Sequence, residues 1–313
     1  MVNRGNPDWI KRIRRSSVPE AELSETNCPV CEQSPRRKLI VERGYPLWKC
    51  LSCKHVYISP RPSEKWLSEL YSSTYLPDTN TEEVWEQSED DIFEATARAI
   101  HRYHPGGGDL LDVGAGFGGF LIRAERDGWK LHGIEPNSSA VAAAQKRLGA
   151  RAQLQQSIFE DADLEPCSYD GIIMMNVIEH VREPRAVCRK AYELLRPGGF
   201  LGLRWPQVSR RTLLRERLRR NHETDRAVIG APIHLHDYSR SSMERLMATS
   251  GFCDVVHAWS GTRHFPNMKP GNHLLVSLLT AMAKYSHSLS GGRIITPFIA
   301  RLSLGKKPSA ANS

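Results

Sequence analysis

The stretch that most constrains the fold of this chain is an apolar run followed by a glycine-rich turn, at residues 110–120. Apolar residues then return at helical spacing. This order predicts a buried strand, a tight turn and the start of a helix, which is how a doubly wound parallel α/β domain opens its ligand site. Gly114, Gly116 and Gly119 also fit the dinucleotide fingerprint G-x-G-x-x-G. The glycines alone therefore leave the identity of the ligand open.

An acidic residue near the turn narrows the choice of ligand. Asp112 stands two positions before the first glycine, at the carboxyl end of the predicted strand. A carboxylate there would repel a pyrophosphate docked on the helix N-terminus, and it favours a ligand with a cationic part. S-adenosylmethionine, with its ammonium and sulfonium groups, is such a ligand. Glu135 ends the next predicted strand and can accept both ribose hydroxyls of an adenosine, a device that NAD enzymes share.

Three stretches resemble the class I S-adenosylmethionine-dependent methyltransferases. Leu-Asp-Val-Gly-Ala-Gly-Phe-Gly at 111–118 is similar to their first motif. A strand at 169–176 runs into Glu-His-Val at 179–181, and Leu-Leu-Arg-Pro-Gly-Gly-Phe-Leu occupies 194–201. The resemblance implies a Rossmann-like doubly wound sheet with S-adenosylmethionine as cofactor. The cofactor-binding residues that it implies are Asp112, Gly114, Gly116, Glu135, Ile158 and Asn176.

Two C-x2-C pairs, with eighteen residues between them, predict a four-thiolate zinc site at Cys28, Cys31, Cys50 and Cys53. Residues 38–41 and 46–49 between the pairs predict two strands around a turn, as in a zinc ribbon. Disulfides are disfavoured in the expected cytoplasmic setting, and a redox centre would need one pair only. Four sulfurs leave no open coordination position, so we expect a structural Zn²⁺.

The segment after the second pair extends the resemblance. Pro60-Arg61-Pro62 is followed by a short predicted helix that contains tyrosines, with Ser63 as its expected N-cap. This order is similar to that of a bacterial methyltransferase group with an N-terminal zinc ribbon. The chain is then expected to divide as follows: a flexible basic arm at 1–26, the zinc ribbon at 27–60, connecting helices at 61–104, the methyltransferase domain at 105–260 with a basic insertion at 206–232, and a C-terminal extension at 261–313.

The methyltransferase region alternates predicted strands and helices. Strands are expected at 109–113, 130–134, 152–156, 169–176 and 200–205, with a sixth after 251, and helices at 118–127, 138–148, 184–195 and 241–250. The insertion combines leucines with many arginines and predicts an amphipathic lid helix over the acceptor site. In the tail, either 274–285 or 294–304 is expected to supply a last strand.

Methyl transfer from a sulfonium is a direct displacement, so the enzyme has to align the groups and exclude water. An oxygen acceptor also needs a base, whereas a carbanion or an amine does not. The candidate bases are His180, His234 and His236, because imidazole titrates in the useful range. A structural histidine in a loop is the alternative for each of them.

The charge and composition of the chain indicate which ligands and which cellular location to expect. The formal net charge is +8, with basic clusters at 11–15 and 204–220 that suit either solvent or an anionic ligand. No apolar run reaches membrane-span length, and the N-terminus has no secretory pattern, so we expect a cytoplasmic protein. The leading interpretation is methylation of an oxygen or carbon atom on a small molecule or glycoconjugate, anionic if the arginines contact it.

Two alternatives belong to other classes. A nicotinamide-dependent oxidoreductase would share the glycine turn, but Asp112 and the Glu-His-Val match argue against it. A nucleic-acid-binding methyltransferase would use the ribbon and the arginines as its contact surface. We consider nucleic acid an improbable partner, because the chain has no basic stripe interleaved with aromatic residues and no Asn-Pro-Pro-Tyr motif.

Overall fold

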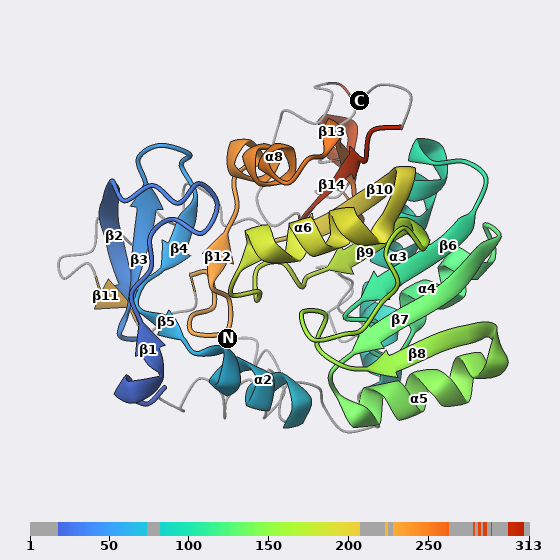
Figure 1. The fold of residues 1–313 in the computed structure, drawn as a ribbon, viewed down its shortest axis with the longest axis horizontal. Coiled ribbons are helices and arrows are strands. Elements are labelled where there is room, and N and C mark those ends of the chain that lie inside the picture. The colour runs from blue at the N-terminus through green and yellow to red at the C-terminus, as the bar shows by residue number, and fades with distance from the viewer. Residues whose placement is uncertain are drawn as a thin grey trace.

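The computed structural model describes residues 18–73, 82–206, 223–224, 228–262 and 300–309, together with seven residues between 278 and 289. A seven-stranded sheet and a five-stranded sheet lie side by side (Figure 1). The elements of the first part are η1 (Glu20–Glu22), β1 (Leu23–Ser24), β2 (Arg36–Glu42), β3 (Tyr45–Cys50), β4 (Val56–Ile58), β5 (Arg61–Pro62), α2 (Glu64–Ser73) and α3 (Glu82–Tyr103). Those of the second part are β6 (Gly108–Val113), α4 (Gly119–Glu125), β7 (Trp129–Glu135), α5 (Ser138–Leu148), η3 (Gly149–Arg151), β8 (Ala152–Gln156), β9 (Tyr169–Met175), α6 (Pro184–Leu194), β10 (Leu195–Trp205), β11 (Glu223–Thr224), β12 (His236–Asp237), α8 (Arg240–Thr249), β13 (Cys253–Trp259) and β14 (Arg301–Lys306).

The seven-stranded sheet has the order β13-β14-β10-β9-β6-β7-β8. The strands from β10 to β8 pair in parallel, and β14 pairs antiparallel with both β10 and β13. The chain starts in the middle at β6 and winds outward in both directions, which confirms the doubly wound Rossmann-like fold. Of the two tail stretches considered, the second supplies the last strand, which runs on to Lys306.

Buried residues on successive positions of β6 face opposite layers. Leu111 belongs to the apolar cluster that includes residues of α6 and α8, whereas Leu110 belongs to the cluster with residues of α3 and α4. This alternation is expected for a strand covered by helices on both faces. Ligands of doubly wound folds bind at the carboxyl ends of the parallel strands, which here are the ends of β6, β7 and β9.

The five-stranded sheet contains the predicted ribbon hairpin. Strands β2 and β3 pair antiparallel and extend the expected ranges by one or two residues at each end. Arg43 and Gly44 join them with φ angles of 50° and 85°. Two consecutive left-handed residues make a type I′ hairpin turn, which matches the twist of the strands. Ser63 caps α2 as expected, because its hydroxyl accepts from the Trp66 amide at 3.1 Å.

The chain that follows β10 returns to this sheet, which was not predicted. Strand β11 pairs with β2 at one edge and β12 pairs with β4 at the other (Figure 1). The predicted lid helix, with Arg210, Arg211, Arg215, Arg217, Arg219 and Arg220, lies outside the described residues. Within the described part of the chain, no helix combines the length and apolarity needed to cross a membrane.

Candidate active site and cysteine cluster

A cavity of about 680 Å³ opens at the carboxyl ends of β6, β7 and β9. A volume of this size suits a small organic ligand. Its lining comes from the glycine turn, from α2 and α3, and from the loop at 228–235. The lining includes all six residues expected to bind the cofactor: Asp112, Gly114, Gly116, Glu135, Ile158 and Asn176. Of the three candidate bases, it includes His180 and His234.

The glycine turn is held against the end of β7. The amides of Gly114 and Ala115 both donate to the Ile134 carbonyl, at 2.8 and 3.0 Å. Gly114 has a φ of 76°, and a Cβ there would lie 2.6 Å from the Val177 side chain. Gly116 has a φ of 52°, and its amide donates to Glu135 Oε2 at 3.0 Å. The turn therefore needs glycine for its backbone conformation, and it joins the two sequence motifs directly.

Asp112 and Glu135 make this end of the cavity electronegative. Both are buried, and burial raises the pKa of each carboxyl group. The neighbouring Glu135 raises the pKa of Asp112 further. Glu135 accepts the Asn137 amide as well as that of Gly116, whereas Asp112 Oδ1 is buried without a hydrogen-bond partner among the described residues. A cationic ligand group in the cavity would satisfy this oxygen and relieve the repulsion.

Asn176 follows β9 in the left-handed conformation, with a φ of 56°. Its amide donates to the Arg204 carbonyl at 2.9 Å, and its side-chain oxygen accepts from the Arg204 guanidinium at 2.5 Å. Asparagine tolerates this conformation better than most residues. The position of Asn176 at the cavity is therefore set by β10, the strand that carries Arg204.

His180 and His234 meet edge to face, with ring centroids 4.6 Å apart. His180 Nδ1 lies 3.2 Å from the Ile233 carbonyl oxygen, which can only accept, so Nδ1 carries the proton and Nε2 the lone pair. The Tyr71 hydroxyl lies 3.0 Å from the same nitrogen. Burial lowers the pKa of His180 well below its ordinary value and that of His234 to about 4. Both rings are therefore neutral near pH 7.

Glu179 lies beside the two histidines. Its Oε1 is 3.9 Å from His180 Nε2, and its Oε2 is buried without a partner in the described part of the chain. Burial raises the pKa of Glu179 to about 8, although Arg204 opposes the rise. One ligand atom from each of Glu179, His180 and His234 lies within 4.8 Å of the others. Tetrahedral ligands about 2.1 Å from a cation are about 3.4 Å apart, compared with the 3.9 Å between Glu179 Oε1 and His180 Nε2.

His236 occupies a different place from the other two candidate bases. Its Nε2 lies 2.8 Å from the Val181 carbonyl oxygen, and its Nδ1 lies 3.1 Å from His55 Nε2. The ring is buried between the two sheets and is not part of the cavity lining. Both ring nitrogens already have partners, so the structure assigns His236 to packing between the ribbon and the methyltransferase sheet.

Several cavity residues were missed by the sequence reasoning. Arg43 of the hairpin turn and Tyr71 of α2 both line the cavity, although neither belongs to the methyltransferase motifs. The sequence marks Glu179 only as part of the Glu-His-Val match. The expected tyrosines after Ser63 were the one signal for Tyr71. Nothing in the sequence around Arg43 indicates that the hairpin turn reaches the site.

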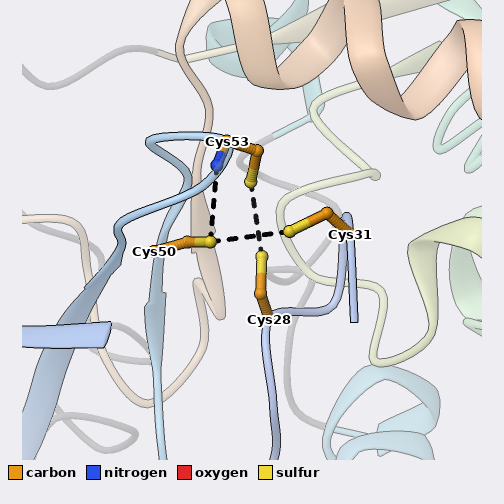
Figure 2. Close-up of side chains that lie close together, drawn as sticks. All are labelled: Cys28, Cys31, Cys50 and Cys53. Carbon is orange, nitrogen blue, oxygen red and sulfur yellow. Dashed lines mark hydrogen bonds between the residues drawn. The ribbon is translucent and has the colours of Figure 1, made fainter. Parts of the chain in front are cut away.

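The four cysteines converge as their spacing predicts. Figure 2 shows the four sulfurs facing one another, with Cys28 and Cys53 Sγ 3.5 Å apart and Cys31 and Cys50 Sγ also 3.5 Å apart. A tetrahedral ion with bonds of about 2.3 Å would space its sulfurs about 3.8 Å apart. A disulfide would need about 2.05 Å. The sulfur separations therefore fit four ligands around one ion.

The two C-x2-C turns share one backbone conformation. Glu32 and Lys54, each directly after the second cysteine of its pair, have φ angles of 61° and 67°. Their amides donate to the carbonyl oxygens of Cys28 and Cys50, at 2.7 and 3.2 Å. Two equivalent turns that each present a pair of sulfurs on one side are what a four-thiolate site requires.

Comparisons with known proteins agree with this geometry. Residues 84–258, more than half of the chain, match the methyltransferase domain family, to which the chain therefore belongs. It is 34% identical over 99 residues to a ubiquinone biosynthesis O-methyltransferase of Sodalis glossinidius, covering 30% of this chain and 39% of that protein. It is 29% identical over 126 residues to the enzyme of the same name from Albidiferax ferrireducens, covering 34% and 50%. The chain thus spans half or less of the length of these relatives.

A solved structure shows the same fold. The phosphoethanolamine N-methyltransferase 2 of Haemonchus contortus, in complex with S-adenosyl-L-methionine, superposes with a TM-score of 0.51 at 19% identity. The match covers 81% of this chain and 63% of that one. The chain therefore carries a methyltransferase domain with the class I, Rossmann-like fold.

Proposed function

We propose that the six cavity residues Asp112, Gly114, Gly116, Glu135, Ile158 and Asn176 bind S-adenosylmethionine. The glycine turn lets the backbone approach the ligand, and the carboxylate of Glu135 can accept the ribose hydroxyls with its remaining lone pairs. The buried, unpartnered Asp112 Oδ1 supports a cationic ligand rather than a pyrophosphate. S-adenosylmethionine supplies an electrophilic methyl group, and the protein's residues hold it in line with the acceptor.

The acceptor is an oxygen atom on a small molecule or glycoconjugate. The observation that carries this proposal is the pair of neutral imidazoles, His180 and His234, in the same cavity as the glycine turn. An oxygen acceptor must lose a proton as it attacks, and a neutral imidazole can take it. The relatives named O-methyltransferases support oxygen as the acceptor atom.

His234 is the better placed of the two bases. Its ring is only partly buried, whereas His180 is 8% exposed and is held by the Ile233 carbonyl. We assign proton transfer to His234, and we assign to His180 the role of orienting it through the edge-to-face contact. Both act on the acceptor and not on the cofactor.

The test measures cofactor binding and methyl transfer separately. Calorimetric titration with S-adenosylhomocysteine should show binding, and NAD should show none. Transfer of labelled methyl groups is then followed with panels of phenols, sugars and amines. His234→Gln should lower methyl transfer about 10²–10⁴-fold with unchanged S-adenosylhomocysteine affinity, and His101→Gln, an exposed position on α3, should change neither. Methylation of amines alone, or full activity in His234→Gln, would contradict the proposal.

We also propose that Cys28, Cys31, Cys50 and Cys53 hold one structural Zn²⁺ in a ribbon module at 27–60, ahead of connecting helices at 61–104 and a methyltransferase domain at 105–260. The matched turns and the sulfur spacing support the ion. The hydrogen bond with Cys53 and burial raise the pKa of Cys28, the same hydrogen bond lowers the pKa of Cys53 to about 5, and burial raises that of Cys31 to about 11. A divalent cation among the sulfurs reverses the rises at Cys28 and Cys31 and keeps the sulfurs as thiolates.

A further inference from the structure

The loop at 228–235 forms a wall of the cavity but belongs to the ribbon. Gly230, Ile233 and His234 line the cavity. Ala231 and Leu235 are buried in the apolar core of the five-stranded sheet and do not line the cavity. The loop therefore presents one set of residues to the acceptor and anchors itself with the other.

The anchor is a single buried carboxylate at the end of β2. Glu42 is fully buried, and it accepts four consecutive backbone N–H groups of the loop. Oε1 accepts from Val228 at 3.0 Å, Gly230 at 3.0 Å and Ala231 at 3.2 Å, and Oε2 accepts from Ile229 at 2.9 Å. Hydrogen bonds to a carboxylate are about twice as strong as those between neutral groups. The four amides therefore share one carboxylate as their hydrogen-bond acceptor.

The ends of the loop are attached to the same sheet. Thr224 pairs with Glu42 in the β11–β2 ladder, and the Ile58 amide donates to the Leu235 carbonyl at 3.1 Å. Within the loop, the His234 amide donates to the Gly230 carbonyl at 3.1 Å, and its ring forms a hydrogen bond with the Ile229 backbone. The two hydrogen-bond partners of His234, Gly230 and Ile229, are thus residues whose own amides donate to Glu42.

We propose that Glu42 is a positioning residue for methyl transfer: it holds the 228–231 backbone so that His234 faces the acceptor. The catalytic consequence rests on the role of His234 proposed above, whereas the structural part stands without it. A side-chain amide in place of the carboxylate removes the charge and offers one accepting oxygen and one NH2 donor, so at least one buried N–H loses its acceptor and the loop must open to water. The proposed cofactor residues lie on β6 and β7 and in the turns after β6, β8 and β9, and none of them is among the four residues whose amides donate to Glu42.

The decisive variant is Glu42→Gln, which keeps the shape and removes the charge. The matched control is Glu165→Gln, an exposed carboxylate outside the ribbon and the cavity lining. Hydrogen exchange is measured by mass spectrometry at 228–235 and, for comparison, at 108–113. In Glu42→Gln we expect hydrogen exchange to be faster in the loop only and the affinity for S-adenosylhomocysteine to be unchanged. Turnover should be at least about tenfold lower, because a hydrogen bond to a charged group is lost.

A spectroscopic signal separates positioning from general destabilisation. His234 is followed by NMR titration and assigned with His234→Gln. In the parent protein it should titrate near its lowered pKa of about 4. In Glu42→Gln, solvation should return its pKa towards the ordinary value of about 6.5. If Glu42→Gln does not fold, Glu42→Asp, which keeps the charge on a shorter side chain, is measured in the same way.

The outcomes are distinguishable. Unchanged loop exchange and an unchanged His234 titration would overturn the proposal. Faster loop exchange with full turnover would overturn the link to the reaction. A parent protein that does not bind S-adenosylhomocysteine or transfer methyl groups would refute the proposed function, and the exchange result would still decide whether Glu42 holds the loop.

Discussion

The two ends of the cavity are built in different ways. At the end that we assign to the cofactor, Gly114, Gly116 and Glu135 lie within 22 residues of one another and meet across adjacent strands. At the acceptor end, Arg43, Tyr71 and His234 come from a hairpin, a helix and a loop that are distant in sequence. The first end is a local motif on a common fold, whereas the second is an assembly that depends on the ribbon. Variants should therefore be able to damage one end and spare the other.

The largest effect is expected from loss of the ribbon's ion. Cys28→Ser removes one of the four ligands and should lose the proposed zinc. A structural zinc site contributes about 10–16 kcal/mol of binding free energy to folding, so the ribbon should unfold with it. Hydrogen exchange should rise at 36–58 and at 228–237, while 108–113 stays protected. Zinc analysis and exchange mass spectrometry measure this. Cys167→Ser, which removes an exposed free cysteine, is the control. A protected 228–237 loop in the zinc-free protein would show that the loop does not depend on the ion, and lost protection at 108–113 would show that the two ends cannot be damaged separately.

Glu135→Ala is expected to damage the cofactor end of the cavity and to spare the acceptor end. Each hydrogen bond to the carboxylate is worth about 1.5–3 kcal/mol, so S-adenosylhomocysteine affinity should fall about 100-fold or more. Exchange at 228–235 should not change, because Glu42 holds that loop. Calorimetry with Glu165→Ala, an exposed position, is the comparison. Undiminished affinity would remove Glu135 from the cofactor site.

Glu179 lies where the two ends meet, and it should make stability depend on pH. Its folded pKa of about 8 is above its unfolded value, so the native state keeps a proton that the unfolded chain loses. Unfolding free energy should therefore fall as pH rises from about 5 to about 8, by about 1 kcal/mol per pH unit. Urea unfolding at several pH values measures the slope. Glu179→Gln should flatten the slope and Glu165→Gln should not; equal slopes in both variants would contradict the assignment.

The smallest effect is expected at the cap of α2, the helix that carries Tyr71 into the cavity. Ser63→Ala removes the hydroxyl that accepts the Trp66 amide, which should cost about 1 kcal/mol of stability. Ser72→Ala, at an exposed hydroxyl near the end of the same helix, should cost less. Thermal unfolding compares the two. A fall in S-adenosylhomocysteine affinity in Ser63→Ala would show that the acceptor end also supports the cofactor.

Much of the cofactor end and of the cysteine cluster could be predicted from the sequence. The turn at Gly114 and Gly116 requires positive φ angles, and short spacings between strand, glycine and carboxylate determine what can meet there. The C-x2-C turns likewise present their sulfurs through local geometry. Elements such as β9 and α6 were expected within a residue or two, because apolar periodicity is a local property of the chain.

Only the tertiary structure decided the acceptor end. Glu42 meets Val228 and Ala231 across 186 and 189 residues of sequence, and no local pattern marks a carboxylate as the partner of such amides. The same holds for the histidines, where His234 reaches the cavity and His236, two residues on, is sealed between the sheets. Residues two apart on a regular strand share a face, but the His234 amide is still bonded to Gly230 in the preceding turn, whereas His236 lies on β12, so the two rings part. The sequence by itself determined the fold, the cofactor motif and the convergence of the cysteines, because these depend on spacing; the acceptor wall depends on how two sheets pack together.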